Sequence, residues 1–239
     1  MKKFFEKLYQ NKFIDFVSLL EENLKKNKKT FVVTANPETF MIAEKEEEFA
    51  RLILDKETLI VPDGVGVVKA AHMLNYPVTE RIAGIDLAWE LLRIGNKYKK
   101  SIYLLGASEE VKEKMVEKIK TDYPNLILKG AINGFGRDKD AEFEKIKREE
   151  PDIILVALGI PAQEKLIYKH LKDFQKGIFM GVGGSFDVIS GTKKRAPKVF
   201  QKLGIEWLYR LLKEPKRIKR FYNSNVKFIF KIKKMKKGE

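Results

Sequence analysis

The segment DIILVALGIPAQEKLIYKHLK, residues 152–172, contains the pattern that predicts the fold. Its unbroken apolar run, residues 153–158, is typical of a strand that is buried on both faces of a sheet. Gly159 and Pro161 then mark a tight loop, and the residues after them have apolar side chains at helical spacing. A buried strand, a short loop and a helix in this order form the repeating unit of a parallel α/β sheet.

The same alternation of strand and helix extends through most of the chain. We expect strands at six short runs rich in apolar and β-branched residues, namely 30–35, 58–62, 101–106, 126–131, 152–159 and 177–183. Segments with helical periodicity lie between them, near 37–54, 64–75, 84–96, 108–121, 139–149 and 162–173. This order predicts an α/β fold with a Rossmann-like, doubly wound, mostly parallel sheet.

The last part of the chain has a different composition. Residues 193–239 contain 17 of the 48 Lys and Arg residues but 3 of the 33 Asp and Glu residues, so they carry +14 of the total net charge of +15. Apolar residues continue at helical spacing through this region, with an interruption at Pro215. We therefore predict a Rossmann-like domain over residues 1–192 and a basic, amphipathic helical appendage over residues 193–239.

The composition also excludes several kinds of chemistry. The chain has no cysteine, which rules out disulfides, thiolate zinc sites and a cysteine nucleophile. Its two histidines, His72 and His170, are far apart in sequence and lack metal-ligand spacing. The N-terminal apolar pattern is interrupted by charges, unlike a signal peptide, and no run of about 18 apolar residues occurs. We expect an intracellular protein without a membrane-spanning helix.

The glycine-rich segments do not match the common nucleotide-binding motifs. Residues 64–69, GVGVVK, have two glycines of the dinucleotide motif but Lys69 in the third position, and residues 190–194, SGTKK, reverse the order of a P-loop. The triplet DKD at 138–140 resembles a metal-binding motif of some glycosyltransferases, but acids at the start of a helix are explained by the helix dipole. We expect no cofactor and no metal ion.

Polar residues gather at the predicted carboxyl ends of the strands, which is where parallel α/β sheets bind ligands. Asp63 directly follows the strand at 58–62, and on its own it is equally a cap of the next helix or a catalytic acid. Its neighbours at other strand ends and loops favour a site. These neighbours are Thr34, Asn36, Gly64, Arg81 and Gln163. A glycine-rich turn adds Gly183, Gly184, Ser185 and Asp187, and such a turn lets a phosphate or sugar approach the backbone closely.

Aromatic and apolar residues interleave with Lys and Arg between Phe221 and Met235. This pattern fits single-stranded nucleic acid, which stacks on aromatic side chains. It also fits a helix in the interface of an anionic membrane, where each basic residue contributes about 1 kcal/mol. The nearly neutral charge of residues 1–192 argues against a long nucleic-acid track, so we favour the membrane.

Seven blocks, in order, resemble the WecG/TagA/CpsF family, glycosyltransferase family 26. They are TANPETF (34–40), VPDGVGVV (61–68), RIAGIDL (81–87), YLLGAS (103–108), DIILVALGIPAQEKLI (152–167), MGVGGSFDVISGTKKRAP (180–197) and LGIEWLYRLLKEPKRIKR (203–220). The resemblance covers about residues 30–222. The first 29 residues match poorly and lack the family's opening apolar strand.

The resemblance implies an inverting, metal-independent transfer of a sugar from a UDP-sugar to an undecaprenyl-diphosphate-linked acceptor at the cytoplasmic membrane face. One branch transfers N-acetylmannosamine to N-acetylglucosaminyl-diphospho-undecaprenol for wall teichoic acid, and others transfer glucose or N-acetylmannosaminuronate. It implies that Asp63 is the base, and that Thr34, Asn36, Arg81 and Gln163 line the active site. The family's C-terminal arginines correspond to Arg210, Arg217 and Arg220.

From the resemblance we expect N-acetylmannosamine transfer. The alternative from another class is a nucleic-acid-binding protein that uses the basic appendage. The expected partners are the UDP-sugar, the lipid-linked acceptor and an anionic membrane surface that contacts residues 193–239, and not nucleic acid. The appendage is expected to close the active site when it docks on the membrane. Away from lipid, self-association would cover the apolar side of residues 221–235.

Overall fold

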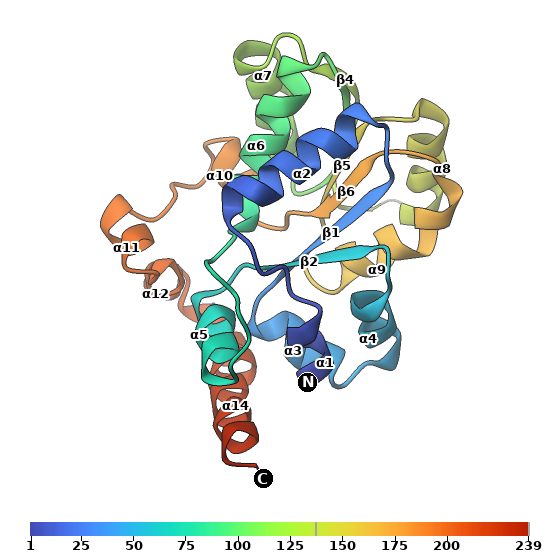
Figure 1. Cartoon of the computed structure of the whole chain (residues 1–239). Coiled ribbons are helices and arrows are strands. Elements are labelled where there is room, and N and C mark those ends of the chain that lie inside the picture. The colour runs from blue at the N-terminus through green and yellow to red at the C-terminus, as the bar shows by residue number, and fades with distance from the viewer. Residues whose placement is uncertain (137, 239) are drawn as a thin grey trace.

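The computed structural model describes residues 1–136 and 138–238, with the side chains of Lys202 and Arg217 left out. In this part of the chain, six strands form one sheet in the order β2-β1-β6-β5-β3-β4, and every pair is parallel (Figure 1). The strands are β1 (Thr30–Ala35), β2 (Thr58–Pro62), β3 (Ser101–Gly106), β4 (Ile127–Ile132), β5 (Ile153–Ala157) and β6 (Ile178–Gly181). The predicted α/β class and parallel sheet are confirmed.

The central strand β5 shows why an unbroken apolar run belongs in this sheet. Ile153 and Leu155 pack into the core on one face, whereas Ile154 and Val156 pack into the core on the other. All four side chains are fully buried. Successive side chains of a strand point to opposite faces, so a strand covered by helices on both sides needs apolar residues at every position.

Helices cover both faces of the sheet. One face packs against α2 (Phe13–Lys25), α6 (Gly84–Lys97), α7 (Glu109–Asp122) and α10 (Ser185–Ile189). The other packs against α1 (Lys2–Glu6), α3 (Pro37–Ala43), α4 (Glu47–Leu54), α5 (Val65–Met73), α8 (Lys139–Glu149) and α9 (Ala162–His170). The helix predicted over 37–54 is therefore two helices, and the one predicted over 162–173 ends as a 3-10 turn, η1 (Leu171–Asp173).

The first 29 residues form helices α1 and α2 rather than a strand. Between these helices, Leu8 makes a single bridge to Ile60 of β2. Phe5 and Phe16 have no exposed surface and belong to the cores on opposite faces. Residues 1–29, which match the family blocks poorly, therefore cover the edge of the sheet near β2.

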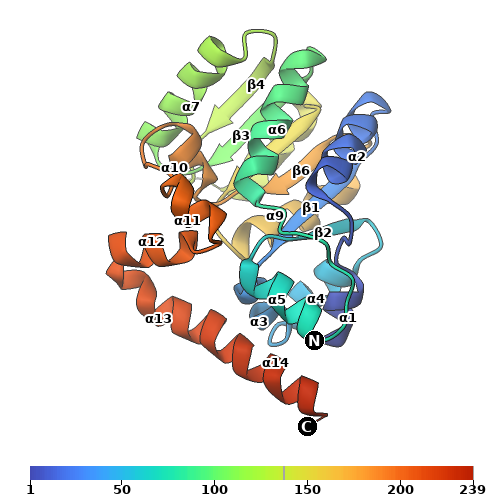
Figure 2. The same cartoon turned by 60° about the vertical axis from the view of Figure 1, so that its left-hand side comes forward.

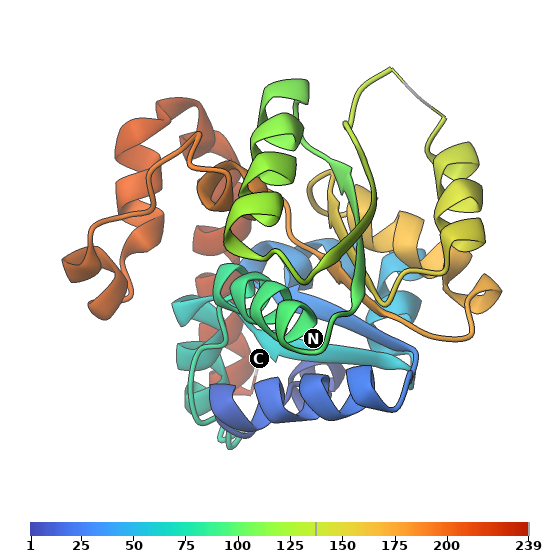
Figure 3. The same cartoon turned by 90° about the horizontal axis from the view of Figure 1, so that it is seen from above.

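The appendage is helical, as predicted, and it extends away from the sheet past the carboxyl ends of the strands (Figures 1 and 2). Seen from above, its first helices lie on the opposite side of the molecule from α8 (Figure 3). Its elements are α11 (Lys198–Lys202), α12 (Glu206–Lys213), η2 (Pro215–Arg217), α13 (Ile218–Phe221), the π-helical turn η3 (Tyr222–Val226) and α14 (Lys227–Lys237). Pro215 separates α12 from α13, as its sequence position predicts.

The end of the appendage packs back onto the body. Phe228 of α14 is fully buried, with its ring 6.0 Å from that of Phe40 and 6.3 Å from that of Phe5. Ile232 is buried in the same core, whereas Ile229 and Phe230 are exposed. Not all of the apolar residues of α14 are therefore available to an external partner. Over residues 1–136 and 138–238, none of the helices has the length and apolarity to cross a membrane.

Candidate active site

A cleft of about 680 Å³ lies at the carboxyl ends of β1, β2 and β6, between the body and the appendage. Parallel strands place their following loops at this edge, which explains why residues distant in sequence meet here. Every site residue predicted from the sequence whose side chain the structure describes lines the cleft. They are Thr34, Asn36, Asp63, Gly64, Arg81, Gln163, Gly183, Gly184, Ser185, Asp187, Arg210 and Arg220. The side chain of Arg217 lies outside the described part of the chain.

Asp63 lies in this cleft, directly after β2. Its backbone N–H donates to Ala35 O at 2.9 Å, which extends the pairing with β1 by one residue. The cap of α5 is Gly64, with no side-chain hydrogen bond, so the interpretation of Asp63 as a helix cap is wrong. Its carboxylate instead lies 3.4 Å from Arg81 Nη2.

The surroundings of Asp63 act on its pKa in opposite directions. Burial raises the pKa, while the charge of Arg81, the N–H of Gly84 and the charge of Arg210 lower it, and the net shift is upward. A carboxylate with a raised pKa binds a proton more readily than an ordinary aspartate. A raised pKa is a property that suits a general base, which must take up a proton.

Gly84 lets Asp63 and Thr34 approach the start of α6 closely. A Cβ atom at residue 84 would lie 3.0 Å from Thr34 Cγ2 and 3.3 Å from Asp63 Oδ2. Both distances are shorter than ordinary van der Waals contact, so a larger residue here would displace the two side chains. The glycine of the RIAGIDL block thus helps to position two residues that line the cleft.

Asn36 and Gln163 hold the loops around the cleft. Asn36 Oδ1 accepts hydrogen bonds from the N–H groups of Glu38 and Thr39 at 2.9 and 3.1 Å and so caps α3. Gln163 Oε1 accepts from the N–H groups of Gly159 and Gly183 at 3.0 and 3.1 Å. One amide therefore ties the loop after β5 to the glycine-rich turn after β6.

The glycine-rich turn is also tied to the appendage. Gly183 has φ of +45°, a left-handed conformation that favours glycine. Asp187 Oδ1 lies 3.2 Å from Nζ of Lys193, the first residue of the appendage. Asp187 is thus engaged in an ion pair at the rim of the cleft.

Arg210 and Arg220 of the appendage line the same cleft. Arg220 Nε donates to Glu38 Oε1 at 2.7 Å, and Arg210 lies near enough to lower the pKa of Asp63. Both guanidinium groups add positive charge to the lining of the cleft, and Glu38 offsets part of that of Arg220. Guanidinium groups bind phosphate oxygens with paired donors.

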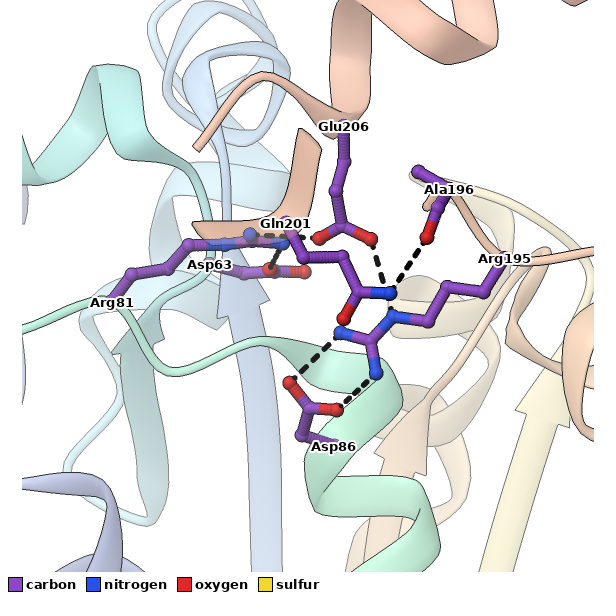
Figure 4. A network of polar contacts seen from close by, with 7 residues as sticks. All are labelled: Asp63, Arg81, Asp86, Arg195, Ala196, Gln201 and Glu206. Atoms are coloured by element: carbon purple, nitrogen blue, oxygen red, sulfur yellow. Dashed lines mark hydrogen bonds and ion pairs between the residues drawn. The ribbon is translucent and has the colours of Figure 1, made fainter. Parts of the chain in front are cut away.

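Sequence reasoning missed Glu206, Arg195 and Asp86, which form a network with Arg81 and Asp63 (Figure 4). Arg81 Nη1 donates to Glu206 Oε2 at 2.9 Å, and Arg195 Nε donates to Glu206 Oε1 at 3.2 Å. Arg195 also makes a two-point pair with Asp86 at 2.6 and 3.1 Å. The available signal was that Glu206 is one of 3 acids among 17 basic residues in the appendage.

Glu164 is a second residue of the cleft that the sequence did not indicate. It is 3% exposed; its Oε1 accepts from Gln163 Nε2 at 2.7 Å, and its Oε2 has no hydrogen-bond partner among the described residues. Burial raises the pKa of Glu164 to about 7, against the opposing hydrogen bonds of Gln163 and the backbone. The carboxyl group is therefore largely protonated below neutral pH.

Glu164 makes the stability of the fold depend on pH. Its folded-state pKa lies above its ordinary value of 4.5, so the folded state binds more protons, and stability falls as pH rises from about 4.5 to about 7. At about 1.4 kcal/mol for each pKa unit, the loss in the free energy of unfolding is about 3 kcal/mol.

Glu164→Gln should remove this pH dependence, because glutamine does not ionise. Between pH 5 and pH 8, the free energy of unfolding of the variant should rise by about 3 kcal/mol relative to that of wild type, as measured by urea unfolding. The exposed control Glu113→Gln should follow wild type, and parallel pH profiles for Glu164→Gln and wild type would contradict this assignment.

The acids of the DKD triplet have structural roles away from the cleft. Asp138 caps α8 by accepting from the N–H of Asp140, and Asp140 pairs with Lys169 and His170. In the described part of the chain, Glu144, His170 and Asp173 are close enough to share an ion, but none of the three lines the cleft. The helix-terminal interpretation of the triplet is supported for Asp138.

Comparisons with known proteins agree with the resemblance seen in the sequence. A model described as the glycosyl transferase WecG/TagA/CpsF family matches residues 6–239. A protein of Bacillus subtilis (strain 168), named N-acetylglucosaminyldiphosphoundecaprenol N-acetyl-beta-D-mannosaminyltransferase, is 41% identical over 206 residues, which are 86% of this chain and 80% of that protein. A protein of the same name from Staphylococcus aureus (strain MW2) is 41% identical over 207 residues, or 87% and 81% of the two chains.

Proposed function

Because the chain belongs to the WecG/TagA/CpsF family of glycosyl transferases, we propose that it transfers N-acetylmannosamine from UDP-N-acetylmannosamine to N-acetylglucosaminyl-diphospho-undecaprenol. The names of the relatives at 41% identity support this donor and acceptor. The reaction would form the linkage unit of wall teichoic acid or of a related surface polymer. Relatives that transfer glucose or N-acetylmannosaminuronate supply the alternative donors.

The observation that carries the proposal is the position of Asp63 beside Arg81, under the arginines of the appendage. In the reaction, the Asp63 carboxylate takes the proton from the attacking hydroxyl of the acceptor sugar. The hydroxyl oxygen bonds to C1 of the donor sugar as the bond from C1 to the UDP diphosphate breaks on the opposite face. This single displacement inverts the configuration at C1.

The departing UDP carries the negative charge that develops in this step. Arg81 and Arg210 line the cleft with Asp63. Fixed guanidinium groups offset such charge without needing to reorganise, which is how preorganised donors stabilise a transition state. The proposed mechanism therefore routes no step through a metal ion.

The appendage suits an enzyme whose acceptor stays in a membrane. Its exposed apolar residues lie among its basic residues, and they are Val199, Leu203, Trp207, Leu212, Ile218, Tyr222, Ile229 and Phe230. Such a surface favours the interface of an anionic bilayer. We propose that the protein binds the cytoplasmic face of the membrane through the appendage, which closes the cleft there. Away from lipid, self-association would cover the apolar side of residues 221–235.

Membrane attachment should depend on both charge and apolar contact. Wild type should co-sediment with vesicles that contain phosphatidylglycerol, less so as salt rises, because surface charges are screened. The double variant Ile229→Glu, Phe230→Glu should bind at least about 10-fold more weakly, since burying each side chain contributes about 1.5–3 kcal/mol. Phe135→Glu, at an exposed aromatic outside the appendage, is the matched control. Equal binding by all three proteins would count against attachment through the appendage.

The donor assignment is tested by mass spectrometry of the lipid product. Purified protein is incubated, with EDTA, with a short-chain N-acetylglucosaminyl-diphospho-lipid and, separately, UDP-N-acetylmannosamine, UDP-glucose or UDP-N-acetylmannosaminuronate. We expect the acceptor to gain one N-acetylhexosamine with the first donor and to remain largely unmodified with the others. Preferential transfer from another donor would replace the proposed sugar, and binding of oligonucleotides without any transfer would favour the nucleic-acid alternative.

A further inference from the structure

A row of alternating charges connects Asp63 to the appendage (Figure 4). It runs from Asp63 to Arg81, to Glu206, to Arg195 and to Asp86, with contacts of 3.4, 2.9, 3.2 and 2.6 Å in that order. Asp63, Arg81 and Asp86 belong to the body, whereas Arg195 and Glu206 belong to the appendage. The row therefore exists only where the two parts are in contact.

Glu206 is the fixed centre of this row. It is 5% exposed, and each of its two oxygens accepts from a different arginine. Burial alone would raise its pKa, but the hydrogen bonds and charges of Arg81 and Arg195 bring it below the ordinary value. Glu206 also lies in the first turn of α12, where the helix dipole favours negative charge. It is therefore an ionised carboxylate held in one position.

Arg81 contacts two carboxylates at different distances, and the contact with Glu206 is the shorter one. The Nη1 atom binds Glu206 at 2.9 Å, while Nη2 makes a longer contact of 3.4 Å with Asp63. The Nε atom is buried without a hydrogen-bond partner among the described residues. An arginine beside a carboxylate ordinarily forms two short parallel hydrogen bonds, and such a pair would hold Asp63 ionised but weakly basic. Glu206 draws Arg81 out of that geometry.

We propose that Glu206 is a positioning residue for the transfer, because it holds Arg81 away from a two-point pair with Asp63 and so leaves the Asp63 carboxylate able to take the acceptor proton. The inference rests on the proposed function, and it gives the appendage a role in base activation besides covering the cleft. Arg195, anchored on Asp86, fixes Glu206 in turn. Contact between the appendage and the body thus affects, through Glu206, how well Asp63 accepts a proton.

The direct test follows the titration of Asp63 by carbon-13 NMR of carboxyl-labelled full-length protein, with the signal assigned from Asp63→Asn. The charged groups that face Asp63 are Arg81 from the body and Arg210 from α12, beside the N–H of Gly84. Glu206→Gln keeps the shape of the side chain but lets Arg81 turn to Asp63. We expect the midpoint of Asp63 to fall by about one pH unit.

The kinetic counterpart is the rate of acceptor-dependent UDP release. Glu206→Gln should lower kcat roughly 10-fold and shift the acidic limb of the pH profile downward, because a less basic carboxylate is a poorer proton acceptor. The KM for the donor should change little. Asp86→Asn is the comparison variant. It loosens the anchor of Arg195 but leaves the contact between Glu206 and Arg81, so its effect should be clearly smaller than that of Glu206→Gln.

An unchanged titration midpoint of Asp63 in Glu206→Gln would overturn the proposal. Equal shifts in Glu206→Gln and Asp86→Asn would also overturn it, because they would indicate that Glu206 acts only by docking the appendage on the body. If Glu206→Gln fails to fold, Arg195→Gln provides the same test, with a smaller downward shift expected and no shift contradicting the proposal. A shifted midpoint in a protein that transfers none of the three sugars would support the role of Glu206 while refuting the proposed function.

Discussion

Asp63→Asn should lower the kcat of acceptor-dependent UDP release by at least about 100-fold, because a general base contributes about 10² to 10⁴ to a rate and an amide cannot take the acceptor proton. The substitution keeps the size of the side chain, and the carboxylate makes a long contact of 3.4 Å with Arg81, so the fold should tolerate it. Donor KM should change far less than kcat. Steady-state kinetics with the soluble acceptor measure both quantities.

The control for this variant is Asp122→Asn, at an exposed aspartate that pairs with Lys118 on α7. It should retain the wild-type rate. A thermal melt of each protein separates loss of the base from loss of the fold. If Asp63→Asn turned over at the wild-type rate, the base would have to be another residue of the cleft.

Arg81→Lys should lower kcat about 100-fold, the second largest effect that we expect. Lysine keeps the positive charge but not the planar pair of donors that guanidinium offers to phosphate oxygens. It also leaves Glu206 without its 2.9 Å partner in the body, so the appendage loses one of its anchors. Loss of a preorganised donor that acts on the developing charge costs about 10² to 10³ in kcat.

Arg93→Lys is the matched control for Arg81→Lys, because Arg93 lies on α6 and pairs with Glu90 outside the cleft. The rates of both variants are compared with and without acceptor, so that donor hydrolysis is not mistaken for transfer. Full activity in Arg81→Lys would mean that the arginines of the appendage suffice to offset the charge of UDP.

The sequence predicted those site residues that lie at the end of a strand or directly after it. Asp63, Thr34 and Asn36 each follow or end a strand, and parallel strands bring their carboxyl ends together whatever the lengths of the crossovers. Arg81 was predicted with the same group, although the loop that carries it follows α5 rather than a strand. The strands themselves were visible because β5 and its neighbours are apolar at every position, as a sheet covered on both faces requires.

Residues that act through distant partners were not predictable in the same way. The contact between Arg81 and Glu206 joins positions 125 residues apart. The one signal in the sequence, an acid in a strongly basic segment, does not identify the partner of Glu206. Glu164 looked like an ordinary polar residue in the first turn of a helix, and its burial follows from the packing of α9 on the sheet. The sequence position of Phe228 suggested an aromatic side chain that faces the membrane, yet Phe228 packs against Phe5 and Phe40.

The stereochemistry of the product tests the central claim, a single displacement assisted by Asp63, most directly. Wild-type protein is given UDP-N-acetyl-α-D-mannosamine and the short-chain N-acetylglucosaminyl-diphospho-lipid, and the anomeric configuration of the new linkage is determined by proton and carbon NMR. The account predicts a β linkage, formed in one step with inversion at C1. An α linkage would contradict it, because retention requires a different path in which Asp63 is not simply the base of a single displacement.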